Sequence, residues 1–222
     1  MTKRQRVLFL GSSLWAFSEG LFGPLFAVFT EQIGGNLLDV SWAWTIYLVV
    51  TGSLIILIGK VSDKKWFSKS YAMYAGYAIN ALCTFAYLLI RTPTQLFLVG
   101  ALSGLANALI EPNWNSLFTR YEDKKQSGSA WGWVGGQAQI LSGLAVLIGG
   151  LIVQYFSFSA LFITMGIVQV ISLYVQIDVL QFQVRKSTKK LLSKRVSLRV
   201  RVRYGKIRRR TRKTRRIAWG LA

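Results

Sequence analysis

The sequence changes from apolar to basic at Gly59-Lys60-Val61-Ser62-Asp63-Lys64-Lys65. One long apolar run precedes this stretch at residues 41–59, and another follows at 71–90. Lysines gather on the cytoplasmic side of membrane helices, so Lys64 and Lys65 indicate an inside loop between two spans. Gly59 is small enough for a neighbouring helix to approach closely, and Asp63 can pair with a cation or with a helix N-terminus.

The composition also indicates a membrane protein. Of the 222 residues, 52% are hydrophobic and 16% are charged, and the mean hydropathy is +0.38. A water-soluble domain of this length needs a more polar surface. The chain has no histidine and a single cysteine, Cys83. These counts exclude histidine-ligated metals, Ser-His and Cys-His catalytic pairs and an intrachain disulfide, and we expect no cofactor.

Six segments are long and apolar enough to span a membrane, because ~20 helical residues cross a hydrocarbon core of ~30 Å. They lie at about 7–29, 41–59, 71–90, 95–119, 129–153 and 158–182. The first resembles a signal peptide at its basic start, but it is too long and lacks a small-residue cleavage site. We therefore predict an all-α fold, with a six-helix membrane bundle over residues 1–184 and a separate tail over 185–222.

The loop charges predict the orientation of this bundle. Ten basic residues lie in the N-terminal segment and in the two loops that would face inside, whereas Arg91 is the one basic residue in the outside loops. Positive residues favour the cytoplasmic side. We expect an integral protein of the plasma (inner) membrane with both termini in the cytoplasm.

The tail differs in composition from the rest of the chain. Seventeen of the 28 Lys and Arg residues lie between Arg185 and Ala222, and none of the 8 acidic residues does. Such a segment can bind anionic lipid headgroups. A nucleic-acid binder tethered to the membrane is an alternative, but no base-reading module is visible. A third interpretation is out-of-frame or truncated sequence from a disrupted gene.

The loop between the second and third spans resembles a motif of major facilitator superfamily transporters, roughly G-x-x-x-D-[RK]-x-G-x-[RK]. Gly59, Asp63 and Lys64 match it, whereas Trp66 replaces its second glycine. Ser68 stands at its last basic position, with Lys69 one residue later.

Further motifs are similar to other spans of the N-terminal six-helix half of such a transporter. They are Leu21-Phe22-Gly23-Pro24, Ser127-Gly128-Ser129-Ala130-Trp131-Gly132, Gly143-x5-Gly149-Gly150 and Phe158-x3-Phe162. The likeness covers about residues 7–182 and ends near Val184. It implies two inverted three-helix repeats, a midplane substrate site between two halves, and transport of a small solute by alternating access. The fourth span lacks the arginine that often precedes its glycines.

Glu19 is the first candidate for chemistry, because it falls near the middle of the first span. A carboxylate at that depth is costly, so it should face a water-filled cavity or a partner. It is either a proton-coupling or substrate-cation site, or a hydrogen-bonded carboxyl that fixes helix packing. Trp15 lies one turn away and is expected to line the same cavity.

Glu111 forms a second polar group in the fourth span, followed by the helix-kinking Pro112. Asn107 is four residues before Glu111, and we expect both to share a cavity-lining face with Trp114 and Asn115. Interhelical hydrogen bonding is the alternative role. For Asn80, Gln137, Gln139 and Gln169 we expect contacts between helices rather than with substrate.

Small residues recur at helical spacing in Gly100-x-x-x-Gly104 and in Gly128-x-x-x-Gly132-x-x-x-Gly136. Such faces let helix backbones meet. These small-residue faces either pack helices together permanently or let helices slide against each other during a transport cycle.

The predicted function is therefore transport of a small solute by a half-length or truncated facilitator-type transporter, with a proton as the candidate co-substrate. The cavity would hold Glu19, Trp15, Asn107, Glu111 and Asn115, and the cytoplasmic gate Gly59, Asp63 and Lys64. No phosphate-binding loop of the ATPase type is present, and no enzymatic activity is expected. Activity would need a second six-span unit, either another copy in a homodimer or a separate chain. The alternative is a non-transporting assembly partner or an inactive fragment.

Overall fold

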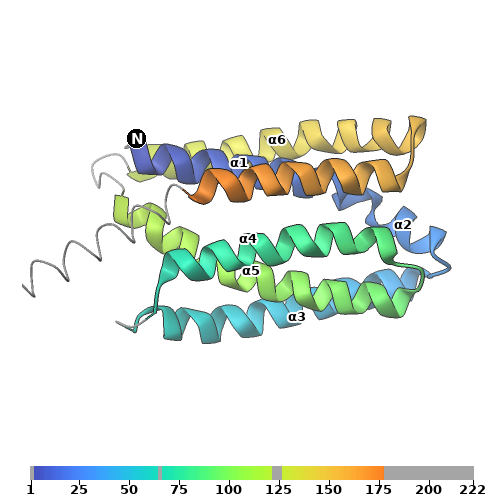
Figure 1. Cartoon of the computed structure of the whole chain (residues 1–222), viewed down its shortest axis with the longest axis horizontal. Coiled ribbons are helices and arrows are strands. Elements are labelled where there is room, and N and C mark those ends of the chain that lie inside the picture. Colours follow the sequence, from blue (N-terminus) through green and yellow to red (C-terminus); the bar gives the residue numbers. More distant parts are fainter. Residues whose placement is uncertain (1–2, 65–66, 122–126, 178–222) are drawn as a thin grey trace, which may run out of the picture. The chain divides into compact units, whose positions relative to one another are not determined.

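The computed structural model describes residues 3–64, 67–121 and 127–177, and every regular element in these ranges is helical. The elements are α1 (Lys3–Phe22), η1 (Gly23–Leu25), α2 (Phe26–Gln32), α3 (Leu37–Ser62), α4 (Lys69–Ala86), η2 (Tyr87–Leu89), α5 (Pro93–Tyr121), α6 (Ser127–Tyr155) and a last helix, Phe158–Ile177 (Figure 1). The prediction of an all-α membrane bundle is confirmed. The predicted tail at 185–222 lies outside the described residues.

Five of the described helices are long and apolar enough to cross a membrane: α3, α4 with η2, α5, α6 and Phe158–Ile177. The predicted span at 7–29 is instead divided into α1, η1 and α2. Pro24 explains the break, because it lacks a backbone N–H and cannot donate to a carbonyl one turn earlier. Glu19 therefore lies one turn before a discontinuity in the first span.

The connection into α3 is a well-capped turn. Gly34 adopts a positive φ of 83°, which glycine tolerates without strain. The side chain of Asn36 accepts hydrogen bonds from the N–H groups of Leu38 and Asp39, at 2.8 and 3.1 Å. Asp39 returns a bond to the Asn36 N–H at 2.8 Å and completes a capping box. This turn fixes where the second span begins.

The helices pair in an order that chain neighbours do not dictate. The most extensive contacts join α1 to α6, α3 to α5 and α4 to α5. If the divided first segment (α1, η1 and α2) is counted as span 1 and the last helix as span 6, these are the pairs 1·5, 2·4 and 3·4. If the bundle consists of two three-span repeats, span 1 corresponds to span 4, span 2 to span 5 and span 3 to span 6. The pair 1·5 then corresponds to the pair 4·2, which is present, and the pair 3·4 corresponds to the pair 6·1. The last helix does bond to α1, because Ser18 and Ser172 each donate to a carbonyl across that pair. This symmetry is what inverted three-helix repeats produce.

Several glycines let these pairs approach closely. A Cβ at Gly104 would lie 2.9 Å from the Tyr47 carbonyl oxygen, and one at Gly20 would lie 2.8 Å from Ser142 Cα. A Cβ at Gly149 would overlap the Leu21 carbonyl. Gly104 thus packs as its spacing predicts. Gly128, Gly132 and Gly136 differ, because a Cβ there would meet no atom within 4 Å among the described residues.

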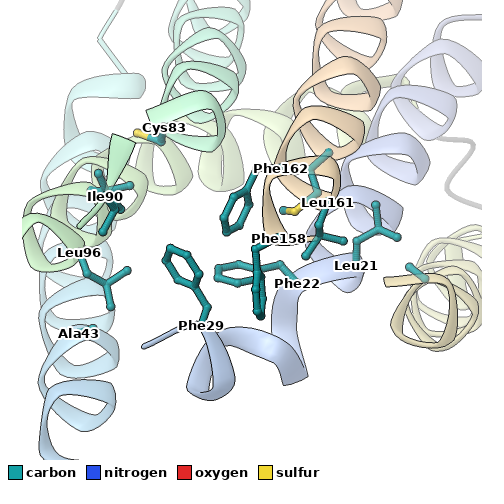
Figure 2. Packing of buried hydrophobic residues seen from close by; sticks show 13 residues of the cluster. Leu21, Phe22, Phe29, Ala43, Cys83, Ile90, Leu96, Phe158, Leu161 and Phe162 are labelled. Carbon is teal, nitrogen blue, oxygen red and sulfur yellow. The ribbon is translucent and has the colours of Figure 1, made fainter. Parts of the chain in front are cut away.

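Two apolar clusters fill the bundle at different levels. One is rich in phenylalanine, with Phe22, Phe29, Phe158 and Phe162 packed at its centre (Figure 2). It lies toward the predicted outer end, at the C-terminal end of α1 and the start of the last helix. The other contains Leu8, Met73, Tyr77, Ile110, Trp114, Leu117 and Phe118, toward the predicted inner end. Glu19 on α1 lies between these levels.

Candidate functional site

Glu19 is hydrogen-bonded to two side-chain amides from two other helices. Asn80 Nδ2 on α4 donates to Glu19 Oε1 at 2.9 Å, and Gln169 Nε2 on the last helix donates to the same oxygen at 3.0 Å. Thr84 Oγ1 donates to Gln169 Oε1 at 2.7 Å. Asn80 and Gln169 therefore connect helices, as expected. The network holds the carboxylate in place from two sides.

The Glu19 residue is nevertheless exposed, because the network covers only part of it. Its open side faces a pocket of about 210 Å³. The lining residues are Glu19, Phe22, Gly23, Phe26, Ala43, Trp44, Tyr47, Asn80, Thr84, Tyr87, Gly100, Ser103 and Met165. The first expectation for Glu19, that it faces a cavity, agrees with this geometry. The hydrogen bonds of the second interpretation are present as well.

Tyr47 on α3 connects this pocket to the polar residues of α5. Asn107 Nδ2 donates to Tyr47 Oη at 2.7 Å, and Tyr47 lines the pocket. The Tyr47 hydroxyl also interacts electrostatically with the carboxylates of Glu19 and Glu111. The hydrogen bond from Asn107 is therefore the direct link between α5 and the pocket lining at Tyr47.

The other predicted cavity residues lie outside the pocket lining. Asn107 reaches the pocket through Tyr47, Glu111 is exposed on α5, and Asn115 is half-buried one turn further. Trp15 packs instead against the inner apolar cluster, and its Nε1 is buried without a hydrogen-bond partner among the described residues.

Trp114 does not share the exposed face expected for it. It is 6% exposed and stacks on Phe118, with ring centroids 4.9 Å apart. Its indole N–H donates to the Leu8 carbonyl at 3.3 Å. Three residues of α-helix turn it about 60° away from Glu111, which is enough to place it in the core.

The predicted gate residues lie at the C-terminal end of α3. Asp63 is the C-cap residue of α3, and its Oδ1 lies 3.6 Å from Lys69 Nζ on α4. Lys69 Nζ also donates to Ser116 Oγ on α5 at 2.7 Å. The lysine that is displaced by one position from the family motif therefore joins three helices. A Cβ at Gly59 would meet nothing within 4 Å, so the expected close helix approach is absent among the described residues.

A second contact next to the gate was not predicted. Ser62 Oγ donates to Asn113 Oδ1 at 2.8 Å, and both residues are buried. Asn113 Nδ2 in turn donates to the Leu109 carbonyl at 2.8 Å. Asn113 follows Pro112 directly, and its side-chain bond ties the next residue to the preceding turn beside the proline, which itself has no N–H to donate. An asparagine after an intrahelical proline was the available signal in the sequence.

The sequence matches the Major Facilitator Superfamily over residues 8–221. The chain belongs to this family. Members of the superfamily are membrane transporters, and the helical bundle is that of an integral membrane protein. The superfamily match continues past residue 182 and includes the basic tail, so the expectation that the likeness ends near Val184 was wrong.

Among curated proteins, the chain is similar to a member of the superfamily described as the proton-coupled antiporter flippase LtaA of Staphylococcus saprophyticus. The two are 25% identical, over 72% of this chain and 43% of that relative. The chain therefore spans less than half the length of the curated facilitator that it matches.

Proposed function

We propose that this chain is one half of a secondary transporter, which moves a small solute by alternating access in exchange for protons bound at Glu19. The observation that carries this proposal is the position of Glu19. Its carboxylate is held by Asn80 of α4 and Gln169 of the last helix, and it is also open to a pocket. Ionisable groups inside membrane proteins mark ion and proton pathways.

Family membership and the similarity to a proton-coupled antiporter support the same proposal. Glu19 would take a proton from the pocket and release it there when the pocket opens to the other side. The hydrogen-bonded amides keep the carboxylate oriented in both protonation states, because an amide N–H can donate to either form.

A second six-span unit would complete the transporter. The apolar helices α3 and α6 are the least buried candidates for spans, with 11% of their most hydrophobic window buried in each. The unpartnered glycines of α6 add a surface on which another helix can pack closely. We propose that the unit is another copy of this chain, in a membrane with both termini cytoplasmic.

The gate residues would act at the inner end of α3. There, Lys69 connects Asp63 to Ser116, and Lys64 and Gly59 flank the same helix end. Opening toward the cytoplasm would require the Lys69 contacts to break. The weak surface pair, with Asp63 84% exposed, suits a contact that must form and break in each cycle.

Transport is tested with the full chain in proteoliposomes that contain a pH-sensitive dye. A panel of amines, sugars and amino acids is added, and solute-triggered proton movement is recorded. Glu19→Gln should abolish this movement while the protein still inserts and remains monodisperse in detergent. Glu31→Gln, at an exposed carboxyl on α2, is the matched control. Unchanged proton movement in Glu19→Gln would refute the role of Glu19.

The dimer is tested by the mass of the purified protein in detergent, with residues 185–222 present and deleted. A dimer in both forms supports assembly from identical halves. A monomer in both forms favours a separate second half, or the non-transporting assembly partner.

A further inference from the structure

The pocket beside Glu19 has an unusual balance of charge. Among the described residues, Glu19 is the one formally charged side chain that lines it, and no lysine or arginine does. Both amide donors bond to Oε1, so among the described residues Oε2 remains open toward a ligand. A pocket with one uncompensated carboxylate favours a cation and disfavours an anion.

Five aromatic rings form a continuous series along the same pocket. The ring of Tyr87 lies 5.1 Å from that of Phe22, centroid to centroid, and Phe22 lies 5.6 Å from Phe26. Phe26 then lies 5.8 Å from Trp44, which lies 5.7 Å from Tyr47. All four contacts are edge-to-face, so successive rings turn different faces outward. Aromatic ring faces attract organic cations within ~6 Å.

The rings come from elements that the fold itself brings together. Phe22 and Phe26 lie on either side of the Gly23-Pro24 break, and Gly23 lines the pocket. Trp44 and Tyr47 lie one turn apart on α3, and Tyr87 begins η2. Phe26, just after the break in the first span, thus contacts Trp44 of α3, and Phe22, just before it, contacts Tyr87.

We infer that this pocket binds a small organic ammonium ion, with its charge against Glu19 and its alkyl groups against the aromatic rings. This inference rests on the proposed transport function and adds the chemical class of the solute. A pocket of about 210 Å³ fits a small amine rather than a large lipid headgroup. A quaternary ammonium needs no hydrogen-bond acceptor, so ring faces and one carboxylate are sufficient to hold it.

If the ammonium ion and the proton both bind at Glu19, the transport of one is coupled to the transport of the other. One carboxylate neutralises either a proton or a monovalent cation. Binding of the ammonium ion therefore releases the proton, and binding of a proton releases the ammonium ion. The other titratable side chains that interact with Glu19 are Tyr47 from α3, and Cys83 and Tyr87 from α4 and η2. Glu111 of α5 interacts electrostatically with Tyr47. Charge is conserved in a one-for-one exchange.

The test is calorimetric titration of the full chain in detergent with tetraethylammonium, at pH 6 and pH 8. We expect saturable binding that is at least as tight at pH 8 as at pH 6, because protons compete with the ammonium ion for Glu19 and the competition weakens as the pH rises. Glu19→Gln should weaken binding at least tenfold. Trp44→Leu should weaken it about 2- to 30-fold, as loss of one cation–π contact predicts. Trp42→Leu, which alters an exposed residue of the same helix outside the pocket, should leave the affinity unchanged.

The inference is overturned if tetraethylammonium does not bind to the native chain, or if it binds equally to the native, Glu19→Gln and Trp44→Leu proteins. Sodium methanesulfonate is the anionic control, and binding of that anion at the same site would also contradict the inference. If Glu19→Gln does not fold, the comparison of Trp44→Leu with Trp42→Leu decides. Glu19-dependent proton movement with another solute would then leave the transport function standing while the ammonium class falls.

Discussion

Gln169 Nε2 donates a hydrogen bond of 3.0 Å to Glu19 Oε1, although 150 residues separate the two in the chain. The bond joins the first helix to the last described one. Gln169 also accepts a hydrogen bond from Thr84 of α4. Replacing Gln169 by methionine keeps the side-chain length but removes both the donor to Glu19 and the acceptor for Thr84. We expect Gln169→Met to lower the free energy of unfolding by about 1–3 kcal/mol and to slow transport. Thermal unfolding in detergent measures the first effect. Gln154→Met, at an exposed position on α6, should leave it unchanged.

Gly149 and Gly150 offer a comparison between adjacent residues. A Cβ at Gly149 would overlap the Leu21 carbonyl of α1, whereas one at Gly150 would meet nothing within 4 Å among the described residues. Gly149→Ala should destabilise the protein by about 1–3 kcal/mol, because α1 and α6 must move apart. Gly150→Ala should have no comparable effect on the melting temperature. Equal melting temperatures for the two variants would contradict the close approach of these helices.

The Asp63–Lys69 pair should matter more to transport rate than to stability. Asp63 is largely exposed, so loss of the pair should change the free energy of unfolding by about 1 kcal/mol or less. Lys69→Met and Asp63→Asn should each slow transport, and the double variant should be no slower than the worse single one, because both remove the same contact. Initial rates in proteoliposomes test this, with Lys60→Met, an exposed lysine of α3, as the control. Additive effects would show that the two residues act separately.

Asn113 should contribute to stability through its bond with Ser62. Both are buried, so Asn113→Leu leaves the Ser62 hydroxyl without its acceptor and should cost about 1–3 kcal/mol. Ser62→Ala removes the donor but leaves Asn113 bonded by its Nδ2 to Leu109, so its cost should be smaller. Thermal unfolding of the two variants side by side measures the difference. A larger loss for Ser62→Ala would show that the Leu109 bond does not support Asn113.

The sequence was sufficient for the fold class, because each helix must satisfy its backbone inside the membrane and so leaves a long apolar run. It also made Glu19 a candidate for the site, since a carboxylate in such a run is rare. The break at Gly23-Pro24 was harder to predict, because the same two residues occur in kinked and in divided helices. The extent of the family likeness was underestimated, since the basic tail has no apolar pattern to compare.

The partners of Glu19 depend on three-dimensional packing and not on local pattern. Gln169 and Asn80 could be recognised as polar groups between helices, but not as donors to the same oxygen. Tyr47 gave no distinct signal, because a tyrosine within a span is common near membrane interfaces. The expectation that Trp114 lines the cavity was wrong because a local pattern was given too much weight. The spacing of Trp114 from Glu111 is close to one turn, and small rotations about the helix axis decide between core and cavity.

Cys83 is buried in α4, with 4% of its surface exposed, and it is the one cysteine of the chain. An alkylating dye added to the folded protein would therefore find no accessible sulfhydryl, and it would react only when the packing around α4 opens. The rate of alkylation under native conditions then measures how often that opening occurs. The molecule thus contains its own chemical reporter of local unfolding, at a position one turn from Asn80 and without any engineered label.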